Sequence, residues 1–158
     1  MATATEALAL NEGLDQGMKL QVSNIIRASR ARVFAAWTEP ELIKTWFGPP
    51  NRVTSSVRVD LRIGGEYRIE MTAEDLDPRV AIASGIYTEI VPDERISFTW
   101  LATWAVGEET LVTVSLKDVP GGTEVTLTHE HFRSFETMNG HEKGWTGALA
   151  KMASVFQN

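Results

Sequence analysis

The three histidines and two tyrosines of this 158-residue chain are the side chains best suited to acid–base chemistry or to holding a polar ligand. His129 and His131 stand two positions apart in TEVTLTHEHF, which alternates like a β-strand, so we expect both imidazoles on one face. On the concave face of a sheet they would serve as acid–base groups, metal ligands or partners of a ligand head. The alternative, which we favour, is that they hydrogen-bond to the end of the last helix or to solvent at the strand end.

Metal and nucleotide chemistry find no support in the sequence. A zinc site would need a third ligand beside the two histidines, and the chain has neither an HExxH motif nor a cysteine. The pairs Gly64-Gly65 and Gly121-Gly122 fall between predicted strands and are typical of turns rather than of phosphate loops. No GxSxG motif marks a nucleophile. We therefore predict no metal and no cofactor.

The tyrosines are candidates for orienting a ligand, because each combines an apolar ring with a hydroxyl group. Tyr67 and Tyr87 both lie on predicted strands. Tyr87 shares its face with Ala83 and Gly85, and we expect these small neighbours to leave room in front of the ring.

Aromatic residues are concentrated in WTEPELIKTWFGPP, residues 37–50. Trp37 falls on one helical stripe with Val33 and Phe34, so we predict that it packs in the core. Trp46 and Phe47 precede the rigid Gly-Pro-Pro exit, and we predict that they lie at the mouth of a pocket.

Further aromatic side chains extend this predicted pocket. Alternation over residues 94–104 places Phe98, Trp100 and Trp104 on one face of a strand. His141 stands one helical turn before Trp145 and would meet the same pocket from a helix. The residues predicted to bind a ligand are Trp46, Phe47, Tyr67, Tyr87, Phe98, Trp100, His129, His131, Trp145 and Met152. Simple core packing is the alternative for each of them.

Two periodicities divide the chain into the elements that position these residues. Residues 19–28 alternate as a first strand, and Ser29 then provides an N-cap for a short helix. Pro40 ends this helix and opens a second one, which stops at Gly48. Short turns then separate six predicted strands, at residues 53–61, 64–71, 80–91, 94–104, 109–119 and 123–132. The first of these six is predicted to place on one face Val53, Ser55, Val57 and Val59.

The C-terminal segment, residues 134–158, is the only one long enough for a major helix. Its single apolar stripe consists of His141, Trp145, Leu149, Met152 and Phe156. Gly140, Gly144 and Gly147 each cost such a helix up to about 1 kcal/mol relative to alanine. The helix therefore begins late, near His141, or its glycines permit close approach to another group.

This order of elements predicts an α+β fold. A meander with one apolar face needs a cover, which a long helix with one apolar stripe supplies. We expect a curved antiparallel sheet of about seven strands wrapped around the C-terminal helix, with two short helices after the first strand. A pocket between sheet and helix is the expected ligand site. Residues 1–17 are predicted to be a flexible tail and residues 18–158 a single domain.

The charge pattern restricts the class of partner. The formal net charge is −6 and the basic residues are scattered, which argues against binding to nucleic acid or to a membrane surface. No apolar run approaches the length of a spanning helix, and the N-terminus lacks the basic start of a secretory signal. We therefore predict a cytoplasmic protein with a hydrophobic small molecule as its partner.

The sequence also resembles a known family in five ordered segments. They are SRARVFAAWTEPELIKTWFGPP, DLRIGGEYRIEM, SGIYTEIVPDERISFTW, TLVTVSLKDVPGGTEVTLTHEH and HEKGWTGALAKM. The resemblance is to bacterial single-domain proteins similar to the C-terminal domain of the activator of heat-shock protein 90 ATPase. These belong to the START-like, or SRPBCC, helix-grip superfamily, which includes birch-pollen-allergen-type proteins and polyketide cyclases. The resemblance implies the helix-grip fold, which hosts lipid carriers, hormone receptors, cyclases and chaperone partners.

Three functions follow from the residues and from the resemblance. The first is binding of a lipid-like, aromatic or polyketide-like molecule between the sheet and the C-terminal helix. The second is a cyclase, dehydratase or hydrolase that uses a cavity histidine or tyrosine as acid or base. The third is a chaperone-interaction module, by analogy with the namesake. Homodimerisation through a sheet edge or an exposed helix is left open.

Overall fold

The computed structural model describes residues 17–48, 52–73, 77–105 and 107–157. Almost all of the predicted tail, residues 1–17, lies outside the described residues. Ten helices and strands follow one another as β1 (Met18–Ile26), α2 (Arg30–Thr38), α3 (Pro40–Trp46), β2 (Val53–Val59), β3 (Glu66–Ala73), β4 (Asp77–Val91), β5 (Arg95–Ala102), β6 (Thr110–Val119), β7 (Gly122–Phe132) and α4 (Phe135–Val155).

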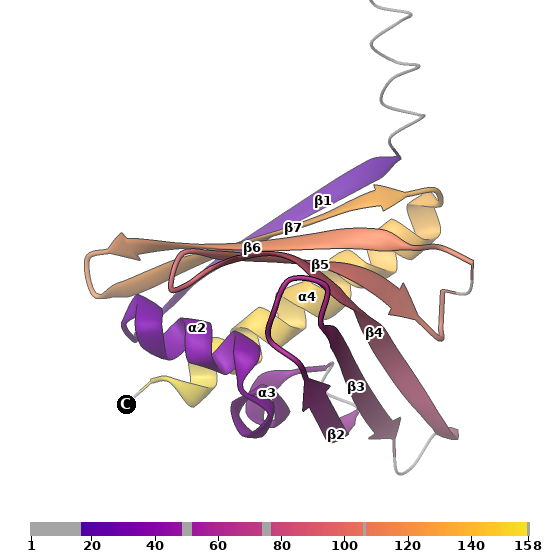
Figure 1. The fold of residues 1–158 in the computed structure, drawn as a ribbon, viewed down its shortest axis with the longest axis horizontal. Coiled ribbons are helices and arrows are strands. Elements are labelled where there is room, and N and C mark those ends of the chain that lie inside the picture. Colours follow the sequence, from indigo (N-terminus) through magenta and orange to yellow (C-terminus); the bar gives the residue numbers. More distant parts are fainter. Residues whose placement is uncertain (1–16, 49–51, 74–76, 106, 158) are drawn as a thin grey trace, which may run out of the picture.

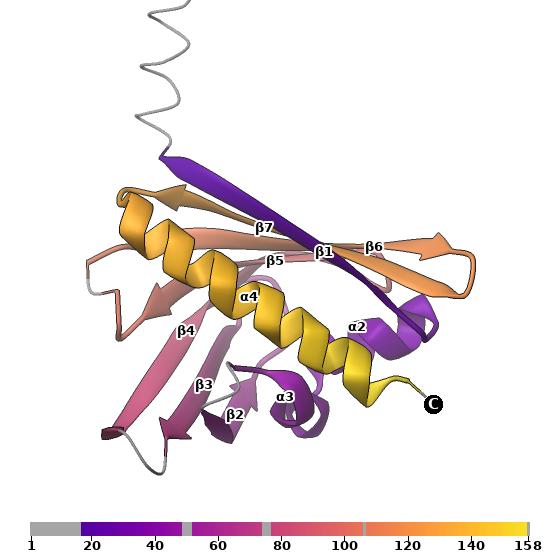
Figure 2. The same cartoon turned by 180° about the vertical axis from the view of Figure 1, so that it is seen from behind.

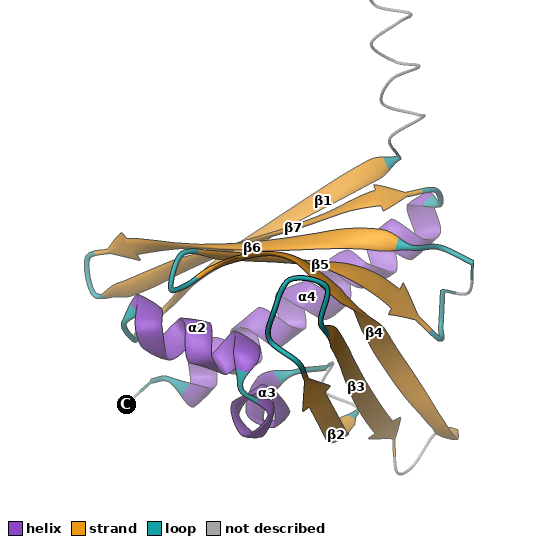
Figure 3. Cartoon of the chain, viewed as in Figure 1, coloured by secondary structure: helices purple, strands orange, loops and turns teal. Residues whose placement is uncertain are grey.

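The seven strands form one antiparallel sheet in the order β1-β7-β6-β5-β4-β3-β2. Consecutive strands from β2 to β7 pair with each other, and β1 joins the sheet beside β7. The sheet bends so strongly that β2, β3 and β4 run steeply across the direction of β1, β6 and β7 (Figure 1). All three helices lie on its concave side (Figure 3), and α4 crosses that side diagonally (Figure 2). The predicted α+β helix-grip fold is confirmed.

Caps and a tryptophan define the helix pair α2 and α3. The Ser29 hydroxyl accepts a hydrogen bond from the Arg32 backbone N–H at 3.3 Å, as an N-cap does. Pro40 occupies the first turn of α3, where its missing N–H costs nothing. The indole N–H of Trp46 donates to the Ala36 carbonyl at 2.8 Å and ties the two helices together. Trp46 is fully buried, so the joint is part of the core.

The long helix α4 begins earlier than its glycines suggest. The Ser134 hydroxyl caps the backbone N–H of Thr137 at 3.3 Å, and the helix starts at Phe135, so the predicted late start near His141 was wrong. The predicted stripe is confirmed, since His141, Trp145, Leu149 and Met152 are buried and Phe156 is half-buried. α4 packs mainly along β1 and also contacts α3. No helix in the described residues has the length and apolarity needed to cross a membrane.

Strand β2 departs from the predicted alternation. The pairing with β3 shifts register between Thr54 and Ser56, so Thr54 faces inward and Val53 is 57% exposed. The prediction that Val53, Ser55, Val57 and Val59 lie on one face was therefore wrong, because the shift separates the first two from the last two. The buried Thr54 hydroxyl donates to the Phe47 carbonyl at 2.9 Å, so the shift connects β2 to the end of α3. After the shift, Val57 and Val59 pack against the core as expected.

Candidate functional site

A half-open cavity of about 490 Å³ lies between the first half of α4, the segment that follows α3, strand β3 and the end of β5. Its aromatic wall consists of Phe47, Trp100, Trp104 and Trp145. Trp104 is 48% exposed and lies beyond the end of β5, so it forms the rim rather than extending the strand face as predicted. The other three side chains are buried and form the floor.

Two glycines on α4 keep one side of this cavity free. Gly140 and Gly144 are one helical turn apart and both line the cavity. A Cβ added at either position would meet no atom within 4 Å. The expected close approach of another group to these glycines is therefore absent, and the space in front of them belongs to the cavity.

The indole of Trp145 is held by a buried histidine. Its N–H donates to Nδ1 of His129 at 3.0 Å, and Nε2 of His129 lies 2.7 Å from the Thr110 hydroxyl. Because Nδ1 accepts, a neutral imidazole carries its proton on Nε2 and donates it to Thr110. The Thr110 hydroxyl in turn donates to the Trp100 carbonyl at 3.4 Å. His129 therefore hydrogen-bonds to the last helix, but at Trp145 in its middle rather than at its end as predicted.

A second histidine holds the second indole in the same way. The N–H of Trp100 donates to Nε2 of His141 at 3.2 Å. Nδ1 of His141 therefore carries the proton and donates to the Thr137 carbonyl at 2.8 Å. The His129 and His141 rings lie 5.1 Å apart, and Trp104 stacks on His141 at 5.9 Å.

Both histidines are kept neutral by their surroundings. Burial disfavours the charged imidazole and lowers the pKa of His129 to about 2, with a smaller contribution from His141. Burial also lowers the pKa of His141, against the opposing effects of the Thr137 carbonyl and of Glu108. Both ring nitrogens of His129 and of His141 form hydrogen bonds within the protein. The two histidines therefore position the indoles and leave no imidazole nitrogen for a substrate. No group of three or more histidines, carboxylates or cysteines in the described residues is arranged to hold a metal ion.

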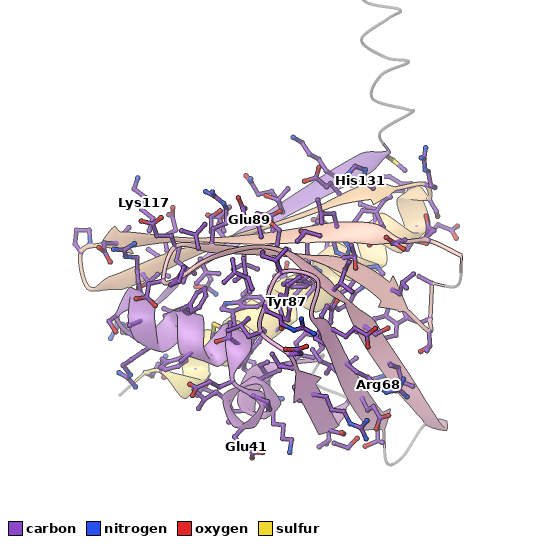
Figure 4. The ribbon with its side chains drawn as sticks, in the orientation of Figure 1. Glu41, Arg68, Tyr87, Glu89, Lys117 and His131 are labelled. Atoms are coloured by element: carbon purple, nitrogen blue, oxygen red, sulfur yellow. The ribbon has the colours of Figure 1, made fainter. Side chains whose placement is uncertain are left out.

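His131 does not share the face of His129, and that prediction was wrong. The pairing of β1 with β7 shifts register opposite this end of β7, and His131 has a positive φ of 76°. Phe132 takes the inward position instead and contacts the His129 ring at 4.3 Å. His131 lies on the outer side of the sheet with its Nε2 3.4 Å from the Glu130 carboxylate (Figure 4).

Both tyrosines are buried around a void deeper than the cavity, and Tyr87 lies on the inner side of the sheet (Figure 4). Tyr67, Tyr87 and Phe98 pack together with ring centroids 5.2–6.1 Å apart, around an inner void of only about 20 Å³. The expected room in front of Tyr87 is filled by these rings, and a Cβ at Gly85 would lie 1.9 Å from the Thr99 carbonyl. That carbonyl accepts a 2.6 Å hydrogen bond from Tyr67. Burial raises the pKa of both tyrosines, so their hydroxyls stay protonated at neutral pH.

The structure thus separates the predicted site residues into groups. Phe47, Trp100 and Trp145 line the cavity, and Trp46 joins the tyrosines and Phe98 around the inner void. His129 and Met152 are fully buried behind the cavity wall. His131 lies on the opposite face. Cavity residues that the sequence did not single out as ligand contacts are Gly48, Arg52, Met71, Gly140, Lys143, Gly144 and Ala148, whereas His141 lines the cavity from the helix as expected. The four-residue spacing of Gly140 and Gly144 was a usable signal for this surface.

The charged groups of the cavity wall are cationic. Arg52 and Lys143 line it, and among the residues that the structure describes no aspartate or glutamate does. Nη1 of Arg52 is buried and has no hydrogen-bond partner in the part of the chain that the structure describes.

Solved structures show the same architecture. CV1439 from Chromobacterium violaceum is 23% identical with a TM-score of 0.81, over 89% of this chain and 97% of its own. An AHSA1-like protein from Aeromonas hydrophila is 27% identical with a TM-score of 0.74, over 87% of this chain and 90% of its own. CalU16 from Micromonospora echinospora is 22% identical with a TM-score of 0.66, over 88% of this chain and 76% of its own.

Sequence comparison agrees with these structural neighbours. None of the curated proteins compared with this chain matches it. A family model described as "Activator of Hsp90 ATPase homolog 1-like protein" matches residues 27–157. Because this match spans the sheet strands from β2 to β7 and all three helices, the chain belongs to the Activator of Hsp90 ATPase homolog 1-like family, within the START-like or SRPBCC superfamily.

Proposed function

We propose that this protein binds a hydrophobic or amphipathic small molecule in the cavity between α4 and the sheet. The observation that carries the proposal is the open space of about 490 Å³ in front of Gly140 and Gly144, walled by aromatic rings. Small-molecule sites are typically apolar clefts of about 300–1,000 Å³ with a few polar groups. The remaining interior is closely packed by comparison, since the inner void measures about 20 Å³.

The fixed indoles support binding because they reduce its entropic cost. Trp100 and Trp145 each donate to a neutral, buried histidine, so their rings are already ordered before a ligand arrives. A site whose side chains are ordered in advance loses less conformational freedom on binding. Flat indole surfaces also suit a ligand with ring systems, because paired aromatic rings attract each other beyond what the burial of their surface contributes.

Blocking the cavity tests the proposal. Gly144→Leu places a branched side chain in the open space, whereas Ala150→Leu adds similar bulk to an exposed position of the same helix. A panel of lipids, aromatic compounds and polyketide-like compounds would be screened by melting temperature and tryptophan fluorescence. We expect hits with the unsubstituted protein and with Ala150→Leu, and their loss with Gly144→Leu. The proposal fails if the panel gives no hit, or if Gly144→Leu binds as the unsubstituted protein does.

The other hypotheses are supported by fewer observations. An acid–base enzyme would need a free histidine nitrogen or an ionisable tyrosine in the cavity, and the buried histidines and tyrosines are occupied as described. Chaperone interaction and homodimerisation rest on the family resemblance and on the exposed sheet edges. Both stay predictions, as do the cytoplasmic location and the single domain of residues 18–158.

A further inference from the structure

We propose that the ligand is an acid, and that Arg52 binds its carboxylate while its apolar part lies against the indoles. This inference rests on the proposed function and adds the chemical class of the ligand. It follows from one unpaired buried donor, from the sign of the charge in the cavity and from the composition of the opposite wall.

The first observation concerns the guanidinium group of Arg52. Its Nη1 is buried and unpartnered, although a guanidinium is charged at every physiological pH. In the described residues only one other buried side-chain nitrogen or oxygen, Nε1 of Trp37, shares this condition. Trp37 is neutral and lines the inner void, whereas Arg52 lines the open cavity. Arg52 as a whole is half-buried, but a charged Nη1 enclosed without an acceptor among the described residues is costly, so its position favours an anionic ligand.

The charge around the cavity is the second observation. Lys143 on α4 joins Arg52 in the wall, and neither forms an ion pair with the residues that the structure describes. His141 is neutral there, and the nearby Glu108 carboxylate accepts a hydrogen bond from the Arg133 backbone N–H outside the wall. The whole chain carries a formal charge of −6, so the charge of the cavity wall is opposite in sign to the net charge of the protein. Such a local field attracts and orients anions.

The remaining wall specifies the rest of the ligand. Met71, Phe47 and the three indoles offer an apolar surface next to the cation, which fits an amphipathic acid better than a small inorganic anion. A guanidinium matches the two oxygens of one carboxylate in a planar, bidentate arrangement. The described residues place one such group in the cavity wall, which suits a single carboxylate. Lys143 is on the exposed side of α4 and contributes through its charge.

Matched pairs of ligands test the inference. Isothermal titration calorimetry would compare 2-naphthoate with 2-naphthamide, 4-phenylbutanoate with its amide and decanoate with its amide. We expect at least one acid to bind about tenfold or more tightly than its amide, and this preference to shrink at high salt. With Arg52→Gln, affinity for that acid should fall about 10- to 100-fold while affinity for the amide stays unchanged. Lys143→Gln should cause a smaller loss.

Arg58→Gln is the matched control, because it removes the same charge from an exposed position of β2. We expect it to leave both affinities unchanged, and melting curves of each variant would verify folding. Equal binding of acids and amides, or an unchanged acid preference in Arg52→Gln, overturns this inference while the proposed function stands. Tighter binding of 2-naphthyl phosphate than of 2-naphthoate overturns the assignment of a carboxylate. If no acid and no amide binds, this inference is overturned, whereas the proposed function is decided by the wider ligand panel.

Discussion

The indole N–H of Trp145 donates a 3.0 Å hydrogen bond to Nδ1 of His129, so an imidazole with no exposed surface fixes a wall of the cavity. The bond requires that Nδ1 be unprotonated. The shape of the cavity is therefore coupled to the protonation state of a residue that does not line it.

The first prediction concerns acid stability. The folded-state pKa of His129 is about 2, below the unfolded value of about 6.5, so the unfolded chain binds more protons between these values. The free energy of unfolding should be insensitive to this group above about pH 6.5 and should fall by about 1.4 kcal/mol per pH unit below it. His141, whose pKa is also lowered, acts with the same sign. Urea unfolding between about pH 5 and pH 8 measures the slope.

His129→Gln provides the control for this titration. Glutamine does not titrate, and its amide can accept from Trp145 and donate to Thr110. The variant should be less stable than the unsubstituted protein at pH 8 but should lose less stability per pH unit on acidification. Identical slopes for the two proteins would show that His129 is not the titrating group.

The second prediction separates two tryptophans. Trp46→Phe leaves the Ala36 carbonyl without its buried donor and should cost about 1–3 kcal/mol of unfolding free energy, with little effect on ligand affinity. Trp104→Ala removes a half-exposed ring at the rim and should weaken binding with a smaller loss of stability. Urea unfolding and ligand titration of both variants check this. If Trp46→Phe weakened ligand binding and Trp104→Ala did not, Trp46 rather than Trp104 would be a ligand contact.

The third prediction concerns the glycines of α4. Gly140→Ala and Gly144→Ala should each raise the free energy of unfolding by about 0.5–1 kcal/mol, because alanine favours the helix and its Cβ meets only open space. Gly121→Ala is the control, since its Cβ also meets nothing but its φ is +87°. That left-handed conformation should make the control variant less stable by about 1–2 kcal/mol. Thermal and urea unfolding of the three variants provide the test.

The fourth prediction concerns Gly85. An added Cβ would lie 1.9 Å from the Thr99 carbonyl, which is backbone and cannot move aside easily. Gly85→Ala should therefore lower the free energy of unfolding by about 1–3 kcal/mol or more, and should disturb the Tyr67 hydroxyl that donates to this carbonyl. Thr88→Ala, an exposed change on the same strand, should stay within about 0.5 kcal/mol of the unsubstituted protein. A Gly85→Ala protein of ordinary stability would contradict the close approach.

Local signals were sufficient to predict most of the fold. Ser29 and Pro40 set helix boundaries through short-range effects that depend only on neighbouring residues. The α4 stripe and the strand alternation report burial directly, because the sequence period matches the geometry of each element. Trp37 was correctly predicted as core, and it packs against Trp46 with ring centroids 4.5 Å apart.

The candidate site was harder to predict, because its features depend on partner strands. The register shifts that turn His131 outward and Thr54 inward arise where β7 meets β1 and where β2 meets β3. Alternation within a single strand cannot reveal such a shift. The Thr99 carbonyl that fills the space beside Gly85 comes from the neighbouring strand. Arg52 reaches the cavity from a strand end, and nothing in its local sequence distinguishes it from the exposed Arg58.

The glycines of α4 also have a consequence for motion. In the half of the helix that borders the cavity, Gly140 and Gly144 face open space on either side of the buried His141, whereas Leu149 and Met152 in the other half are buried. Segments with few buried contacts open most readily, and their amide protons exchange fastest with solvent. We expect amide exchange to be faster around residues 140–144 than around residues 149–152. A bound ligand should slow exchange in the first segment most, which would let hydrogen exchange locate the ligand before its identity is known.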